Sequence, residues 1–232
     1  MLFLFDIDGT LVRRLPPAHR DAICAACLEV YGVTLTPAAL GGTAGMTDRA
    51  ILRRALLAAG LDATTIAAGL PAFLALAADA YDRLVDADLR AYRTPHAEEA
   101  LRWLAERGVA LGLVTGNIER VAWRKLSAAG LAEFFRCGAF GSEADARDDL
   151  PPLALARAEA IFGRPFAPQQ VFVVGDTPAD IACGAASGLR TIGVATGPEH
   201  TREHLRDCHP VFLLDDLRGL EALELGLANR SA

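Results

Sequence analysis

The sequence predicts an α/β protein: a core built on a doubly wound parallel sheet, interrupted near its start by a small helical domain. Three observations predict this fold. Five short apolar runs are continuous rather than alternating, as expected of strands that are covered on both faces of a parallel sheet. Stretches with helical character lie between most of these runs. A long interval rich in alanine and leucine separates the first run from the second and predicts the inserted domain.

The apolar runs define the expected strands, and strand and helix alternate from the second run onward. The strands are LFLF at 2–5, ALGLV at 110–114, VFVVG at 171–175, TIGVA at 191–195 and VFLL at 211–214. The expected helices lie at 118–129, 151–162, 179–187 and 201–206. This alternation is typical of a Rossmann-like, doubly wound domain.

The interval from residue 12 to residue 109 is too long for a single crossover helix. Helical patterns at 17–31, 48–59 and 64–84, separated by turns with Gly, Thr and Pro, predict a small helical domain. A polar stretch at 88–95 then returns the chain to the core, and 97–107 is the expected crossover helix. We therefore assign residues 1–12 and 90–232 to the core and residues 13–89 to a helical cap domain.

Composition and charge exclude several classes of protein. With 52% hydrophobic and 22% charged residues, the chain resembles ordinary folded proteins. A net charge of -6 and the lack of a basic patch argue against a nucleic-acid partner. No apolar run approaches the roughly 18 residues that span a bilayer, and the first residues lack the basic and apolar regions of a signal peptide. We therefore expect no membrane partner and a cytoplasmic location; the oligomeric state is not indicated.

Polar residues follow three of the expected strands. Asp6 and Asp8 lie in DIDGT, Thr115 begins TGN, and Asp176 and Asp180 lie in GDTPAD. Ligands bind at the carboxyl ends of strands in an open parallel sheet, so we expect these side chains to meet at one edge. Crowded carboxylates repel one another unless a cation lies among them, and oxygen ligands favour Mg²⁺ over zinc. The sequence therefore predicts a magnesium site, with Asp176 placed to bind the metal.

These residue types suit phosphoryl transfer. Bound Mg²⁺ screens an anionic nucleophile from an anionic phosphate, so that Asp6 can attack and form an aspartyl-phosphate. Asp8 can protonate the leaving-group oxygen and later activate water. The hydroxyl of Thr115 and the backbone N–H groups of Gly116 and Asn117 offer donors to the phosphoryl group at a helix start.

The motifs DIDGT, VTGN and GDTPAD, in this order and with a helical insert after the first, resemble the haloacid dehalogenase superfamily of hydrolases over essentially the whole chain. The resemblance implies that Asp6 is the nucleophile, Asp8 the acid/base and Thr115 a phosphate ligand. It also implies that the carboxylates of Asp6 and Asp176 and the carbonyl of Asp8 hold Mg²⁺. Asp180 would orient the metal or a basic residue.

That basic residue is expected before the helix that precedes the last motif. The family places a lysine, or sometimes an arginine, there to balance the charge of nucleophile and phosphate. The usual Lys-Pro pair is absent between residues 126 and 175, and the segment reads SEADARDDLPPLALARA. Arg147 is the expected replacement, whereas Arg157 falls within an expected helix and is expected at the surface.

Asp8 favours phosphoryl chemistry over dehalogenation, and the absence of lysine from residues 13–95 excludes a phosphonatase Schiff base. We expect hydrolysis of a small phosphorylated metabolite; a sugar-phosphate mutase and a non-catalytic phosphate-binding module are the alternatives. The segment GGTAGMTDR at 41–49 resembles the cap loop of phosphoglycolate-phosphatase-like members. There Thr47 either binds substrate or caps a helix, and Arg49 either meets a substrate carboxylate or is solvated.

Overall fold

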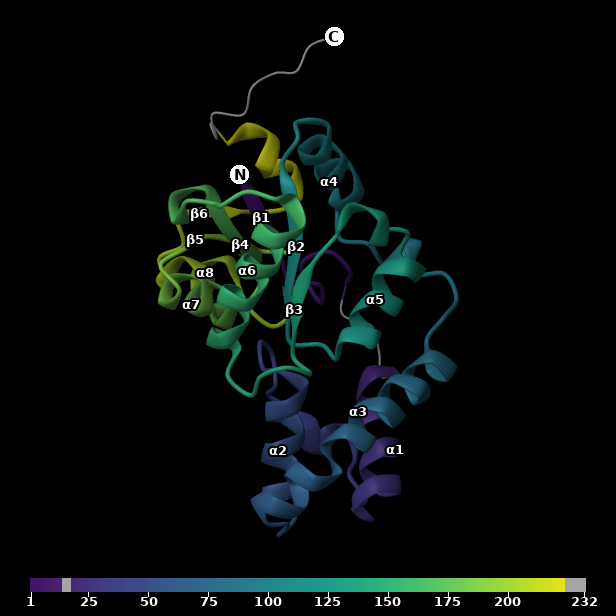
Figure 1. The fold of residues 1–232 in the computed structure, drawn as a ribbon. Helices are drawn as coiled ribbons and strands as arrows, with labels where there is room; N and C mark the ends of the chain where they lie inside the picture. Colours follow the sequence, from purple (N-terminus) through teal and green to yellow (C-terminus); the bar gives the residue numbers. More distant parts are fainter. Residues whose placement is uncertain (14–17, 224–232) are drawn as a thin grey trace.

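A computed structural model describes residues 1–13 and 18–223 (Figure 1). The expected start of the first insert helix at residue 17, and residues 224–232 of the expected core, lie outside the described residues. The described residues form a six-stranded parallel sheet covered by helices on both faces, with a group of helices beside it. The α/β fold predicted from the sequence is confirmed.

The strand order of the sheet is β3-β2-β1-β4-β5-β6, and every neighbouring pair is parallel. The strands are β1 (Leu2–Phe5), β2 (Ala110–Thr115), β3 (Gly138–Phe140), β4 (Val171–Gly175), β5 (Arg190–Val194) and β6 (Phe212–Leu214). Five of them correspond to the expected apolar runs, whereas β3 was not predicted. Its sequence is only Gly-Ala-Phe, so it carries little of the β-branched and aromatic signal of a strand.

Both faces of the sheet are buried, which explains why its strands read as continuous apolar runs. Leu2 and Leu4 face one hydrophobic cluster, and Phe3 and Phe5 face the other, because successive side chains of a strand point to opposite sides. Helices α6 (Leu150–Phe162) and α7 (Pro178–Ala186) contribute to the first cluster. Helices α4 (Ala97–Glu106) and α5 (Glu119–Ala128) contribute to the second, and α8 (Arg202–Asp207) contacts β5 and β6.

The insert consists of α1 (Ala18–Tyr31), α2 (Asp48–Ala58) and α3 (Ala63–Leu84), which lie below the sheet in Figure 1. These helices share a hydrophobic cluster that is separate from the two clusters of the sheet. Ile118 and Val121 at the start of α5 belong to the same cluster, so the insert is packed against the core there. Short 3₁₀ turns complete the chain: η1 (Pro37–Leu40), η2 (Arg90–Tyr92), η3 (Ala132–Phe134), η4 (Arg147–Asp149), η5 (Pro168–Gln170) and η6 (Leu217–Ala222).

Helix α3 corrects the expectation that no apolar segment approaches membrane-spanning length. Its 22 residues are long and apolar enough to cross a bilayer by length and composition. The helix contains Pro71, and Phe73, Ala77 and Tyr81 are buried in the cluster that it shares with α1. Core helices of soluble proteins reach the same length and composition, so this helix by itself is weak evidence for a membrane.

Candidate active site

The polar residues after three strands meet at one edge of the sheet. β1 lies between β2 and β4, so the loops that contain Asp6, Gly116 and Asp176 leave the sheet side by side. A cavity of about 440 Å³ lies between these loops and the insert. Its walls include Asp6, Asp8, Gly116, Asn117, Lys125 and Arg147 from the core, and His19, Arg20, Asp48 and Tyr81 from the insert.

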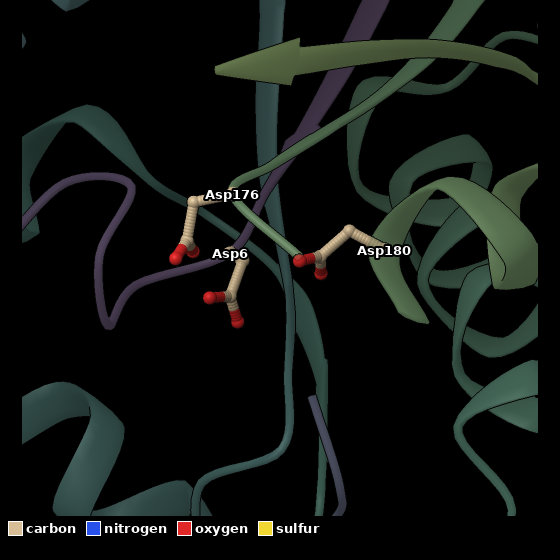
Figure 2. Close-up of side chains that lie close together, drawn as sticks. All are labelled: Asp6, Asp176 and Asp180. Atoms are coloured by element: carbon tan, nitrogen blue, oxygen red, sulfur yellow. The ribbon is translucent and has the colours of Figure 1, made fainter. Parts of the chain in front are cut away.

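Three buried carboxylates form an acidic cluster at the base of this edge. Figure 2 shows the side chains of Asp6, Asp176 and Asp180 converging from the β1 loop, the β4 loop and the start of α7. One oxygen of each lies within 4.8 Å of the others, and the residues are only 6%, 3% and 1% exposed. A set of oxygen donors of this kind fits a hard divalent cation such as Mg²⁺.

Two glycines make room for the Asp176 carboxylate. A Cβ atom at Gly9, where φ is +93°, would lie 2.2 Å from Asp176 Oδ2, and one at Gly197 would lie 1.8 Å from the same oxygen. The hydroxyl of Thr10 donates to Asp176 Oδ1 over 3.1 Å. The DIDGT loop therefore wraps closely around Asp176, and its glycine is required for the positive φ as well as for the space.

Arg147 is the positive charge next to the acidic cluster. It lies in η4, directly before α6, and its Nη2 atom donates to Asp6 Oδ1 over 3.0 Å and to Asp180 Oδ1. Nη1 donates to the carbonyl of Gly45 in the insert over 3.3 Å. Arg157, by contrast, pairs with Glu143, and its side chain is 41% exposed, as expected of a residue at the surface.

Asp180 holds Arg147 in place. Its Oδ2 atom accepts hydrogen bonds from the backbone N–H and the hydroxyl of Thr177, over 3.0 and 2.6 Å, which closes a capping box at the start of α7. Its Oδ1 atom accepts from Arg147. A Cβ atom at Gly175 would lie 2.1 Å from Asp180 Cγ, so the glycine at the end of β4 allows this arrangement.

Asp6 resists ionisation. Burial and the nearby charge of Asp180 raise the pKa of Asp6 to about 7, although Arg147 acts in the opposite direction. Burial alone would lower the pKa of Arg147, but Asp180 and Asp6 outweigh it and raise that pKa, so the guanidinium stays charged. A divalent cation among these carboxylates would favour their ionised forms.

We expect Mg²⁺ to raise the melting temperature more at pH 7.5 than at pH 5.5. The pKa of Asp6 is higher in the folded state than in the unfolded chain, so the free energy of unfolding falls as pH rises from about 4 to about 7. Metal binding to ionised Asp6 offsets this loss. At 100 times its Kd, Mg²⁺ adds about 2.7 kcal/mol, or roughly 5–11 °C in a chain of this size. Melting curves with Mg²⁺ and with EDTA test this; an equal shift at both pH values, or an unchanged shift in Asp176→Asn, would contradict it.

Lys125 is a site residue that the motifs do not indicate. From the last turn of α5 its Nζ atom reaches Asp8, 2.8 Å from Oδ1 and 2.6 Å from Oδ2, and it is only 2% exposed. The sequence contains a signal for it, because Lys125 is the sole lysine in a chain whose other basic residues are arginine or histidine. Apart from that signal, a single lysine on a helix after the TGN motif is typical of a surface residue, so the local sequence does not assign Lys125 to the site.

Asp8 has an environment opposite to that of Asp6. Burial by itself would raise its pKa, but the charge of Lys125 and the hydrogen bonds from Lys125 and Asn117 outweigh burial and lower that pKa to about 2. Its carboxylate faces Lys125 and does not belong to the acidic cluster. The surroundings therefore shift the pKa values of the two aspartates of DIDGT in opposite directions.

The TGN loop after β2 connects the core to the insert. Thr115 is buried and is not among the residues that line the cavity, and its hydroxyl accepts a hydrogen bond from Asn117 Nδ2 over 2.7 Å. The carbonyl of Gly116 accepts from the backbone N–H of Asp48 over 2.7 Å. A Cβ atom at Gly116 would lie 2.2 Å from the carbonyl oxygen of Met46, so this glycine permits the close approach of the insert.

Thr47 and Arg49 are not brought to the cavity. Thr47 is the N-cap of α2: its hydroxyl accepts from Ala50 N over 3.1 Å and donates to the Asp145 carbonyl over 2.9 Å. The capping interpretation is therefore confirmed. Arg49 forms an ion pair with Asp145, 2.9 Å from Nε to Oδ1. Asp48, between them, lines the cavity instead.

The chain is similar to known proteins over most of its length. The family model of the haloacid dehalogenase-like hydrolases matches residues 1–188. A phosphoglycolate phosphatase of Pseudomonas putida is 30% identical over 223 residues, which cover 94% of this chain and 78% of that protein. The crystal structure of a predicted phosphoglycolate phosphatase from Haemophilus somnus has a TM-score of 0.67 and 21% identity, covering 95% of this chain and 96% of that one. A β-phosphoglucomutase from Clostridium difficile shares the fold at a TM-score of 0.68 and 17% identity, with 94% and 92% covered.

Proposed function

The chain belongs to the haloacid dehalogenase-like hydrolases and is a phosphatase, and we propose that it hydrolyses a small phosphate monoester through an aspartyl-phosphate on Asp6, with Mg²⁺ as cofactor. The observation that carries the proposal is the setting of Asp6. This carboxylate lies at the end of the central strand, borders the cavity, contacts Arg147 and lies beside Asp176. Such a setting suits a nucleophile that meets an anionic phosphate.

In the proposed reaction the Asp6 carboxylate attacks phosphorus and the bond to the leaving oxygen breaks. Asp6, Asp176 and the Asp8 carbonyl are the proposed ligands of Mg²⁺, which when bound screens and stabilises charge on the phosphoryl oxygens. Arg147 offsets charge on the nucleophile, while Thr115 and the N–H groups of Gly116 and Asn117 orient the phosphoryl group.

Asp8 is the proposed acid and base. It gives a proton to the leaving oxygen and then takes one from the water that attacks the aspartyl-phosphate. The pKa of about 2 means that Asp8 is deprotonated in the substrate-free protein, which is the form that the second role requires. A phosphate dianion bound beside Asp8 raises that pKa again, so substrate binding favours the protonated form of Asp8 that donates to the leaving oxygen.

The cavity supports a small substrate that bears a second anionic group. Its volume of about 440 Å³ fits a metabolite rather than a polymer. Arg20 of α1 belongs to its lining and offers a positive partner to a carboxylate. Phosphoglycolate, the substrate in the name of the Pseudomonas putida relative, is therefore the first candidate.

A panel of phosphorylated metabolites tests the proposal. With Mg²⁺ we expect phosphate release from phosphoglycolate and other small phosphate monoesters, and with EDTA we expect almost none. Hexose phosphates and an aryl phosphate complete the panel. Phosphoryl transfer to a sugar without free phosphate would instead favour the mutase, and tight phosphate binding with no turnover would favour the non-catalytic module.

We place this reaction in the cytoplasm, with a small phosphorylated metabolite as partner. All five cysteines are free, and Cys27, Cys137 and Cys183 are buried. Unpaired buried thiols suit a reducing compartment. The net charge of -6 gives no support for a nucleic-acid partner.

A further inference from the structure

Resting on the proposed function, we propose that Lys125 is the positioning residue of the acid/base carboxylate: it fixes Asp8 in the orientation that reaches the leaving-group oxygen. The site then has one cation for each catalytic aspartate. Arg147 serves the nucleophile Asp6, and Lys125 serves Asp8.

The contacts of Lys125 show how it would act. An ammonium group has three N–H donors and no acceptor. Around Nζ lie the Asp8 carboxylate, Asn117 Oδ1 at 2.6 Å and His19 Nδ1 at 3.3 Å. Four acceptor atoms from these three groups share the three donors, which leaves none for a substrate. Lys125 acts through Asp8 and is not itself a catalytic residue.

Asp8 is held from two sides. Lys125 donates to both carboxylate oxygens, and Asn117 Nδ2 donates to Oδ2 over 2.8 Å. Rotation of the carboxylate would break at least one of these bonds, so its plane is fixed relative to the cavity. Effective proton transfer depends on such fixed geometry.

The choice of lysine at this position also has a physical reason. Lysine is almost never fully buried unless it is paired. Lys125 lies in the last turn of α5, where a lysine side chain would normally extend into solvent, but here it is buried. The planar fork of arginine cannot direct three donors from one nitrogen, whereas a compact ammonium group can. The sole lysine of the chain thus lies at a position where an arginine could not make the same set of hydrogen bonds.

The insert completes this arrangement. His19 accepts from Lys125 at Nδ1, so in the neutral ring Nε2 carries the proton and donates to Asp48 Oδ2 over 3.0 Å. Asp48 Oδ2 also accepts from the backbone N–H of Ile118, at the start of the helix that carries Lys125, over 2.7 Å. His19, the third acceptor group around Lys125, therefore comes from α1 and is held in place by Asp48 of α2.

Leaving-group dependence separates this positioning role from a purely structural one. We compare Lys125→Met with Arg124→Met, which removes a loosely paired cation from the same helix, 3.6 Å from Asp82. The substrates are p-nitrophenyl phosphate and the alkyl phosphate that wild type hydrolyses fastest. In Lys125→Met we expect kcat/KM to fall about 100-fold on the alkyl phosphate and less than about 10-fold on the aryl phosphate, because nitrophenolate leaves without a proton. Arg124→Met should match wild type on both.

A double-mutant cycle provides the second test. If Lys125 acts only through Asp8, then Asp8→Asn/Lys125→Met should have the same kcat/KM as Asp8→Asn. The double variant removes both buried charges together, so this comparison decides the proposal even if Lys125→Met does not fold. Equal losses on the two substrates, or a further loss in the double variant, would overturn it. Failure of the proposed function would appear differently, as full activity in Asp6→Asn.

Discussion

Asp6→Asn is expected to abolish phosphatase activity while leaving the protein folded. An amide cannot form the acyl phosphate, and removal of a nucleophile lowers kcat by on the order of 10⁴- to 10⁶-fold. The fold should tolerate the change, because burial and Asp180 already make ionisation of Asp6 unfavourable. Phosphate release from an aryl phosphate with Mg²⁺ measures the loss, and circular dichroism measures the fold.

The control for this experiment is Asp88→Asn, which neutralises a carboxylate that is 64% exposed and lies 3.7 Å from Arg90. It should have wild-type activity. Rapid acid quenching of wild type during turnover should also trap phosphate on the protein in a form that hydroxylamine releases. Equal activity in Asp6→Asn and wild type would rule out the aspartyl-phosphate mechanism.

The strand-end residues can be predicted from the sequence because strand burial is a local pattern. A continuous apolar run such as LFLF must end where the chain leaves the sheet, so Asp6 has to lie at its edge. The same reasoning places Thr115 and Asp176. Strand β3 cannot be predicted in this way, because its three residues include two with small side chains and do not form a continuous apolar run.

Residues whose positions depend on the meeting of distant helices cannot be predicted in this way. Lys125 meets Asp8 only because α5 packs beside the β1 loop, and His19 meets Lys125 only because α1 brings it to the same cavity. Arg49 shows the converse: its place in the expected cap loop leaves open a substrate carboxylate or solvent as its partner, and Asp145 from the core is the partner it meets. Local sequence sets secondary structure, and tertiary packing chooses the partners of long side chains.

Arg147→Met is expected to lower both stability and activity. The Arg147 side chain is only 7% exposed and its guanidinium contacts Asp6 and Asp180, so its removal leaves buried acids without their counter-ion. Breaking a buried pair costs about 3–5 kcal/mol, and loss of a charge-stabilising donor lowers kcat by about 10²- to 10³-fold. Urea unfolding and steady-state kinetics measure the two effects.

Arg157→Met is the matched control, because it removes the same group from a partly exposed pair with Glu143 and should change stability by about 1 kcal/mol or less. Arg147→Lys should recover part of the activity, since it keeps the charge but not the paired contacts of the guanidinium. Arg147 lowers the pKa of Asp6, so its loss raises that pKa further. The acid limb of the kcat/KM profile should therefore move to higher pH in Arg147→Met and stay in place in Arg157→Met. The opposite pattern would assign the counter-ion of the nucleophile to Arg157.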